Sequence, residues 1–180
     1  MRILKENTVG LIIDIQERLF PAMHEKEKFL ETTTKLIDGI QHLEIPLLLT
    51  QQYTKGLGET IYEIKSKITS YEPIEKRTFS CCDEPTITQK LSEIKAKNII
   101  ICGIESHVCV LQTAVDLKDS GFNPVVVMDC VSSRKSTSID LAKDRFRFEG
   151  IMMTSMESIL FELTRSSAAD EFKAISKLVK

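Results

Sequence analysis

The sequence predicts an α/β protein, a three-layer sandwich in which helices cover both faces of a mainly parallel sheet. Short apolar runs alternate along the chain with longer amphipathic segments. The apolar runs are nearly continuous, which is typical of strands that are buried on both faces. No linker rich in Pro, Gly or Ser and no internal repeat divides the 180 residues, so we expect one domain over residues 1–180.

Strands are expected at the short apolar runs. These are residues 9–15 (VGLIIDI), 45–50 (IPLLLT), 98–102 (NIIIC), 124–128 (PVVVM) and 151–154. Residues 51–80 form the least regular segment, and we expect loops over the sheet edge there.

Helices are expected where apolar residues recur at helical spacing or where start and stop signals occur. They are residues 26–43, 86–95, 109–120 and 136–148, with two shorter pieces over residues 156–180 that separate near Ser166. Pro85 precedes the second helix, whereas Gly121 and Gly150 follow the third and fourth, as helix boundaries favour.

Composition and charge exclude several classes of protein. The formal net charge is -2 and no basic block stands out, so we expect no nucleic-acid partner. The first residues are too polar for a signal peptide and no apolar run is long enough to span a membrane, so we expect a cytoplasmic protein. The number of cysteines, five, is odd, and the start of the chain is polar. We therefore expect no disulfide framework.

Ligands of such folds bind at the carboxyl ends of the strands. Asp14 and Thr50 close the first two predicted strands. Gly103 follows the strand at 98–102, and Asp129 closes the next one. Cys109 comes shortly after Gly103, where a helix is expected to begin.

Cys109 is therefore the cysteine with a reason to be reactive. Backbone N–H groups and the dipole at a helix start stabilise a thiolate, which is the nucleophilic form. Cys102 and Cys130 lie in or at the ends of strands and are expected in the core, since free cysteine is usually a small buried hydrophobe. Cys81 and Cys82 lie in the irregular segment, where one of them could face the site.

Asp14 and Lys76 carry the charges nearest to this chemistry. A carboxylate after four apolar strand residues is costly unless it is paired or solvated, so Asp14 is either a turn residue or a general base. Lys76 lies in the polar stretch PIEKRTFS, whose spacing alone indicates a solvated surface charge.

Three segments resemble the catalytic motifs of the isochorismatase-like hydrolases, in order and in spacing. They are LIIDIQERLF, EKRTFS and GIESHVCVLQTAVDLKDSG, and the resemblance extends over residues 9 to about 163. TQQYTKGLG, CGIESHVC and DCVSSR are similar in particular to the small isochorismatase-domain-containing proteins. The resemblance implies a six-stranded, mainly parallel sheet in Rossmann-like order.

The resemblance also implies the roles of individual residues. Asp14 matches the acid/base aspartate, Lys76 the lysine and Cys109 the nucleophile of a catalytic triad. The peptide bond between Ile104 and Glu105 matches a cis bond of the family, and the N–H groups of Glu105 and Cys109 would form an oxyanion hole. The implied activity is amidase-like hydrolysis of a small carbonyl compound through a thioester.

Five further residues are candidates for the substrate pocket. They are Gln16, Phe20, Tyr53, Phe79 and His107. The aromatic residues could equally be plain core, and His107 could equally turn outward from its loop. Gln16 matches the family's D-x-Q and could instead bond the catalytic loop.

Two features of the sequence disfavour particular activities of this superfamily. Nicotinamidases of this superfamily bind a metal through an Asp-x-His and a further His after the second strand, whereas TQQYTKGLGETIYEIK contains no histidine. We therefore expect neither a metal nor another cofactor. Cys109 argues against vinyl-ether hydrolysis, which does not require the cysteine.

Two other classes of protein are alternatives to a hydrolase. A catalytically silent interaction or scaffold protein on the same fold is compatible with the sequence. A flavodoxin-like nucleotide binder is disfavoured because LIIDIQERLFPAM, after the first strand, has no glycine for a phosphate loop. The resemblance further implies a homo-oligomer, and apolar residues at helical spacing in 166–180 could pack on the chain's own domain or on a partner.

Overall fold

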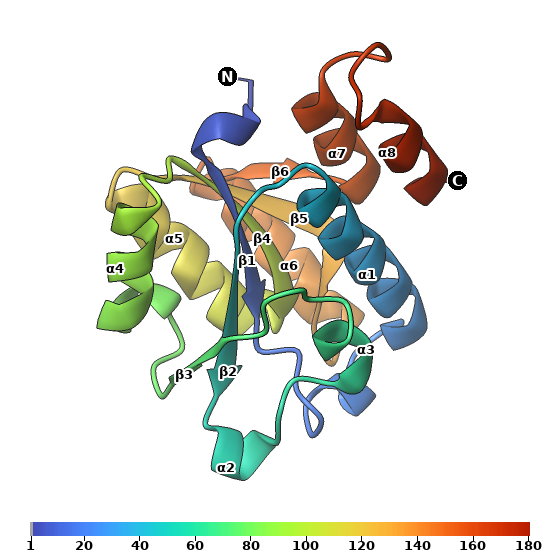
Figure 1. The fold of residues 1–180 in the computed structure, drawn as a ribbon. Coiled ribbons are helices and arrows are strands. Elements are labelled where there is room, and N and C mark those ends of the chain that lie inside the picture. The colour runs from blue at the N-terminus through green and yellow to red at the C-terminus, as the bar shows by residue number, and fades with distance from the viewer. Residues whose placement is uncertain (1) are drawn as a thin grey trace.

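A computed structural model describes residues 2–180, and its centre is a sheet of six parallel strands (Figure 1). The strands are β1 (Thr8–Ile13), β2 (Leu47–Gln52), β3 (Pro73–Lys76), β4 (Asn98–Ile104), β5 (Asn123–Ser132) and β6 (Met152–Thr154). Their order across the sheet is β3-β2-β1-β4-β5-β6. The predicted fold class and the Rossmann-like order are confirmed.

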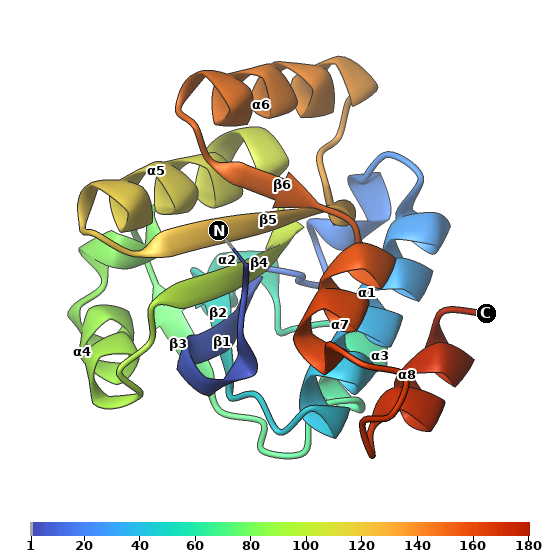
Figure 2. The ribbon, with the colours of Figure 1, turned by 90° about the horizontal axis from the view of Figure 1, so that it is seen from above.

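Helices cover both faces of the sheet (Figure 2). One layer contains α1 (Lys26–His42), α3 (Tyr62–Lys65), α7 (Met156–Thr164) and α8 (Phe172–Leu178), and the other contains α4 (Pro85–Glu93), α5 (Leu111–Asp119) and α6 (Ser136–Phe148). The short helix α2 (Thr54–Leu57) lies beyond the end of β2.

A hydrophobic cluster lies between the sheet and each layer of helices. Side chains alternate along β1, so Ile12 belongs to the cluster under α1 whereas Leu11 and Ile13 belong to the cluster under α5. All three are at most 1% exposed. Fully burying such a side chain contributes about 1.5–3 kcal/mol, so each helical layer is held on mainly by apolar contacts.

The C-terminal segment packs on its own domain. Ile175 of α8 is 0% exposed and belongs to the cluster under α1, with Leu178 and Val179 packed against it. The predicted division of this segment into two helices is confirmed by α7 and α8. Its apolar face is therefore covered within the chain.

Several element boundaries differ from the predicted ones, and three of these differences affect the site. The irregular segment contains an additional strand, β3, whose alternation of exposed and buried residues is only four residues long. β5 continues to Ser132 through an irregularity in its pairing with β4, so Asp129 lies inside the strand. The helix expected from Cys109 is preceded by a π-helical turn, Ser106–Val110, that includes the cysteine.

Gly103 allows β4 to approach the end of β1 closely. Its φ is 125°, and a Cβ atom there would lie 2.1 Å from the carbonyl oxygen of Ile13. Only glycine fits such a contact with this backbone conformation. The loop that carries Cys109 thus begins directly beside the residue that precedes Asp14.

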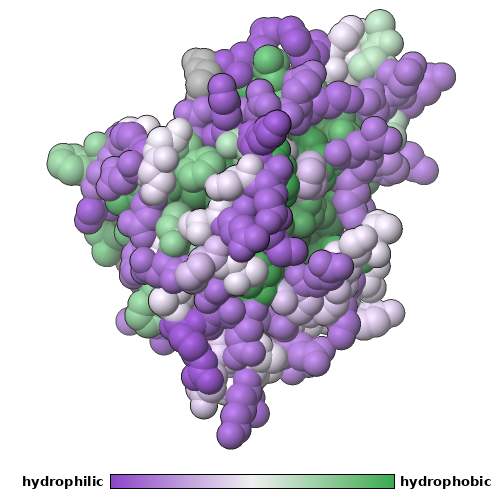
Figure 3. All heavy atoms as spheres, turned by 60° about the vertical axis from the view of Figure 1, so that its left-hand side comes forward, coloured by the Kyte–Doolittle hydropathy of each residue, from purple (hydrophilic) through white to green (hydrophobic). Residues whose placement is uncertain are grey.

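Hydrophilic residues cover most of the face shown in Figure 3, with hydrophobic residues in patches between them. Larger exposed hydrophobic side chains include Leu141 at 70% and Phe148 at 84%, both on α6. Among residues 2–180, no helix is long and apolar enough to cross a membrane.

Candidate active site

Asp14 is completely buried directly after β1. Its φ of 52° is left-handed, a conformation that Asp tolerates better than most residues, and it ends the strand. The side chain is 0% exposed, and each carboxylate oxygen has a donor. Thr50 Oγ1 donates to Oδ1 at 2.7 Å, and Lys76 Nζ donates to Oδ2 at 2.7 Å. Asp14 is therefore not a solvated turn residue.

Lys76 points inward from the end of β3. The residue is 1% exposed, which contradicts the surface charge that its polar surroundings indicate. Besides Asp14, its Nζ donates to Gln52 Oε1 at 2.8 Å and to the carbonyl oxygens of Thr78 at 3.1 Å and Phe79 at 3.2 Å. Every partner is an acceptor, as an ammonium group requires.

The charge of Lys76 is maintained by its neighbours. Burial by itself lowers the pKa of this ammonium, but the negative charge of Asp14, with smaller contributions from Cys81 and Cys109, raises it above the ordinary 10.5. Lys76 is therefore a permanent cation at neutral pH.

Cys109 lies in the π-helical turn beside this pair and is 7% exposed. Among Asp14, Lys76 and Cys109, it is the most exposed. Burial, together with the charge of Asp14 and a hydrogen bond with Asp14, raises the pKa of its thiol to about 12, although the charge of Lys76 lowers it. Burial therefore opposes the stabilisation of a thiolate that the helix start is expected to provide.

The turn around Cys109 is held by Glu105. The N–H groups of Val108 and Val110, on either side of Cys109, both donate to the Glu105 carbonyl oxygen, at 3.1 and 3.2 Å. The Glu105 carboxylate accepts from the backbone N and the Nε of Arg134, both at 3.1 Å. The peptide bond between Ile104 and Glu105 is cis, as the resemblance implies.

The side chain of Gln16 forms hydrogen bonds with backbone groups near the site. Its side chain is 0% exposed, and its amide bonds both backbone groups of Gln52: Nε2 donates to the carbonyl oxygen at 3.0 Å, and Oε1 accepts from the N–H at 2.7 Å. Nε2 also donates to the carbonyl oxygen of Gly58 at 2.7 Å. The hydrogen bonds of this side chain thus go to the end of β2 and to Gly58, and not to the loop that carries Cys109.

The remaining pocket candidates are dispersed. Phe20 packs against Phe29 with ring centroids 6.3 Å apart and joins the core under α1. His107 turns to the loop after β5, where its Nδ1 lies 2.9 Å from Ser133 Oγ. Tyr53 is 38% exposed with the guanidinium of Arg77 3.9 Å from its ring centroid, whereas Phe79, 55% exposed, contacts Lys76 through its carbonyl group.

The other cysteines divide as expected. Cys102 and Cys130 are 2% and 0% exposed in the core. Cys81 is the member of the pair 81–82 that faces the triad: burial raises its pKa to about 12, and the charges of Lys76 and Asp14 also act on it. Cys82 is half-buried near Asp116, with a pKa that burial raises to about 11.

The sequence-based search missed the residues that bind the Asp14–Lys76 pair. Thr50 was noted at a strand end but not as a donor to Asp14, and Gln52 was not singled out. The missed signal is the alternation in β2 and β3, which puts Thr50, Gln52 and Lys76 on one face of the sheet, because Gln52 lies beside Lys76 in the strand register.

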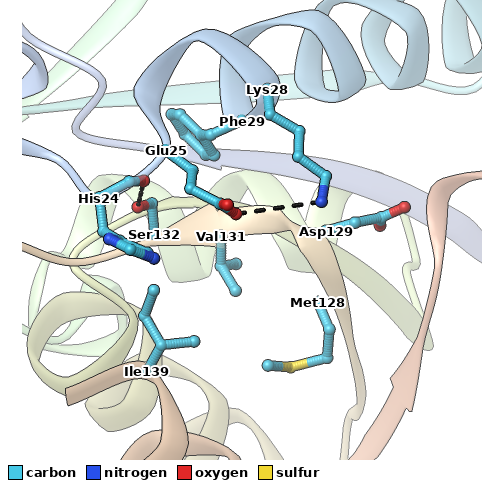
Figure 4. Close-up of a pocket in the computed structure, with 9 residues that line it drawn as sticks. All are labelled: His24, Glu25, Lys28, Phe29, Met128, Asp129, Val131, Ser132 and Ile139. Atoms are coloured by element: carbon cyan, nitrogen blue, oxygen red, sulfur yellow. Dashed lines mark hydrogen bonds and ion pairs between the residues drawn. The ribbon is translucent and has the colours of Figure 1, made fainter. Parts of the chain in front are cut away.

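A separate pocket of about 200 Å³ lies at the same sheet edge, between the start of α1 and the end of β5 (Figure 4). It is lined by His24, Glu25, Lys28, Phe29, Met128, Asp129, Val131, Ser132 and Ile139. No residue predicted for the site from the sequence lines it. Among residues 2–180, no group of three or more His, Cys, Asp or Glu side chains could hold a metal ion.

The isochorismatase domain model matches residues 8–158. The chain belongs to the isochorismatase family. Membership of this family indicates a hydrolase.

Individual relatives support the same family. Isochorismatase domain-containing protein 2A of Mus musculus is 31% identical over 180 residues, covering 99% of this chain and 85% of that protein. A secreted isochorismatase effector of Phytophthora sojae is 34% identical over 184 residues, covering 99% and 87%. The solved structure of a Caenorhabditis elegans protein called MAR1 ribonuclease matches with a TM-score of 0.94 and 36% identity, covering 99% of this chain and 92% of that one.

Proposed function

We propose that this isochorismatase-family chain is a metal-independent cysteine hydrolase that cleaves a non-peptide C–N bond in a small amide or related carbonyl compound. The observation that carries the proposal is the ion pair between Asp14 and Lys76, with both side chains 0% exposed, beside the partly accessible Cys109. A buried ion pair is costly to desolvate and is weak evidence for stability. Perturbed titratable groups of this kind cluster at functional sites.

The first half of the reaction is acylation of Cys109. With a thiol pKa of about 12, free thiolate is scarce at neutral pH, so the attack needs a local base. Asp14 takes the thiol proton, the sulfur attacks the substrate carbonyl carbon, and the N–H groups of Glu105 and Cys109 receive the oxyanion. The C–N bond then breaks, and the amine leaves with the proton from Asp14.

The second half releases the acid. Water attacks the thioester and passes a proton to Asp14, the C–S bond breaks, and the thiol of Cys109 regains its proton. Lys76 stays protonated throughout and stabilises the negative charge that moves between Asp14 and the sulfur. The sum is amide plus water to carboxylic acid plus amine.

A small substrate fits this site better than RNA, although a relative bears the name ribonuclease. Asp14 is 0% and Cys109 7% exposed, so a reacting group must be small enough to reach them. Binding a polyanion is driven by many basic contacts, whereas the net charge of this chain is -2.

Thiol labelling tests the nucleophile. Exposure alone favours Cys82, which is half-buried and has the smaller pKa rise, to about 11. If the triad activates its cysteine, iodoacetamide modifies Cys109 faster than the other four cysteines, as measured by peptide mass spectrometry over time. Labelling that is even, or that concentrates on Cys81 or Cys82, contradicts the assignment.

Turnover tests the base. A screen over small amides, ureides and carbamoyl compounds, with an RNA oligonucleotide alongside, should find activity that Cys109→Ala abolishes. Asp14→Asn should lower turnover by about 10²–10⁴-fold through loss of proton transfer. Identical traces for wild type and Cys109→Ala would favour a catalytically silent scaffold.

Two expectations about the whole protein stay predictions. The homo-oligomer needs a surface other than the C-terminal segment, and the exposed side of α6 with Leu141 and Phe148 is a candidate. Light scattering that gives a monomer mass would contradict it. Cell fractionation tests the cytoplasmic location.

A further inference from the structure

Gln52 occupies the end of β2, one strand away from Asp14. β1 ends at Ile13 and its register with β2 ends at Leu49, so the last backbone groups of β2 have no strand partner on that side. The Gln16 amide takes that place: it donates to the Gln52 carbonyl and accepts from the Gln52 N–H. A side-chain amide has the donor and acceptor of a peptide group, so it can continue the ladder.

The Gln52 side chain is held at both of its polar atoms. Its Nε2 donates to the Arg77 carbonyl oxygen at 2.8 Å, and its Oε1 accepts from Lys76 Nζ at 2.8 Å. The donation to Arg77 assigns the oxygen, and not the nitrogen, to Lys76. Strand pairing places Gln52 directly beside Lys76.

These bonds close a ring through the site. From Asp14 the chain runs two residues to Gln16, whose amide holds the Gln52 backbone. The Gln52 side chain holds Lys76, and Lys76 returns to the Asp14 carboxylate. Gln52 is the only side chain other than Asp14 that accepts from Lys76 among the hydrogen bonds of residues 2–180.

We propose that Gln52 is a positioning residue of the hydrolase, which acts through Lys76 by keeping its buried ammonium charged and directed at the Asp14–Cys109 pair. The inference rests on the proposed function for its catalytic meaning. The Lys76 side chain is 0% exposed, so water does not readily replace a lost acceptor. Without Gln52, the cation is less well stabilised, and the Cys109 thiolate loses part of its counter-charge.

The chain supplies a matched control in the neighbouring residue. Gln51 is 4% exposed on the same strand, and alternation directs its side chain to the opposite face from Thr50 and Gln52. Its Nε2 has no hydrogen-bond partner among the described residues. Gln51→Met and Gln52→Met therefore make the same chemical change at adjacent sites, and only the second removes an acceptor from Lys76.

The experiment is the iodoacetamide labelling rate of Cys109 as a function of pH, from about 7 to about 11. This range lies below the thiol pKa of about 12, so the rate at each pH follows the small fraction of thiolate. Gln52→Met should move the profile to higher pH and lower the rate at a fixed pH by about tenfold, which corresponds to one pKa unit. Gln51→Met should reproduce the wild-type profile. Circular dichroism and urea unfolding establish that each variant is folded.

If Gln52→Met does not fold, Gln52→Ala serves in its place, with Gln51→Ala as its control. Both variants remove a side-chain amide, but only Gln52→Ala removes an acceptor from Lys76, so only its profile should move to higher pH. An unchanged profile, or an equal movement in Gln51→Met, overturns the role of Gln52.

Failure of this inference is distinguishable from failure of the proposed function. Labelling requires no substrate, whereas the function is tested by turnover in wild type and Cys109→Ala. Turnover that depends on Cys109, together with labelling profiles that do not respond to Gln52, removes only the positioning role.

Discussion

Two groups of charged residues lie at the carboxyl edge of the sheet, and they differ in how their charges meet solvent. Asp14 and Lys76 are 0% exposed and 2.7 Å apart, and each has further hydrogen-bond partners. In the pocket of Figure 4, Glu25 and Lys28 are 61% and 74% exposed, and their charged atoms are 3.9 Å apart. The pocket of Figure 4 thus contains the more exposed and more widely spaced ion pair.

The difference teaches that burial, and not the number of charges, distinguishes the candidate active site. An exposed ion pair is screened by water and contributes little. A buried pair interacts strongly, and losing one partner leaves an uncompensated charge in the interior. We expect substitutions at the two sites to separate accordingly.

The largest difference should come from removing one lysine at each site. Lys76→Met leaves the Asp14 carboxylate buried without its cation, which should cost about 3–5 kcal/mol of unfolding free energy. Lys28→Met should leave stability nearly unchanged, since exposed pairs contribute about 0–1 kcal/mol. Urea unfolding of both variants measures the contrast, and similar losses would remove the distinction between the sites.

A smaller difference should come from removing one hydroxyl at each site. Thr50→Val removes the donor to Asp14 Oδ1 at nearly constant shape, and hydrogen bonds to charged groups contribute about 1.5–3 kcal/mol. Ser132→Ala removes a donor to the His24 carbonyl oxygen, a neutral bond that contributes about 0.5–1.5 kcal/mol. Equal losses in thermal or urea unfolding would mean that Asp14 does not need Thr50 in the folded state.

A further effect should appear only in alkaline solution. The pKa of Cys109 is about 12 in the folded chain, above the ordinary 9.0, so between these values the unfolded chain has lost a proton that the folded chain keeps. Stability is therefore fully present below pH 9 and falls as pH rises toward 12. Lys76, whose pKa is raised above 10.5, acts in the same direction.

Cys109→Ala removes one such proton. The slope of unfolding free energy against pH should become shallower in this alkaline range by up to about 1.4 kcal/mol per pH unit. Met128→Ala, in the pocket of Figure 4, has no titrating group to remove and should change the stability without changing the slope. Parallel slopes for wild type and Cys109→Ala would contradict the raised pKa.

Most of the fold could be predicted because its signals are local. The five apolar runs all become strands, and each predicted helix has a counterpart in the structure. The missed strand, β3, begins with a proline and contains two charged residues in four, so its composition resembles a loop. It pairs at the sheet edge with β2, a contact that no local pattern records.

Some residues of the candidate site could be predicted from the sequence, and others could not. Cys109 and Asp14 could be selected from their places after apolar strands, whereas Lys76 depended on resemblance to a family. The partners of this pair, Thr50 and Gln52, could not be selected, because polar residues at strand ends are common and their significance depends on which strand lies beside them. The raised pKa of Cys109 could not be predicted for the same reason: a helix start is visible in a sequence, but the extent of burial is not.

The sequence by itself determined the layered α/β architecture, the residues of the core and the positions where chemistry was to be sought, because periodicity and strand length are properties of short segments. Only the tertiary structure decided that a lysine in a polar stretch is buried against Asp14, that two glutamines connect β2 to this pair, and that burial raises the pKa of Cys109. These outcomes depend on desolvation and on contacts between residues 24 to 62 positions apart in the chain, which no local pattern contains.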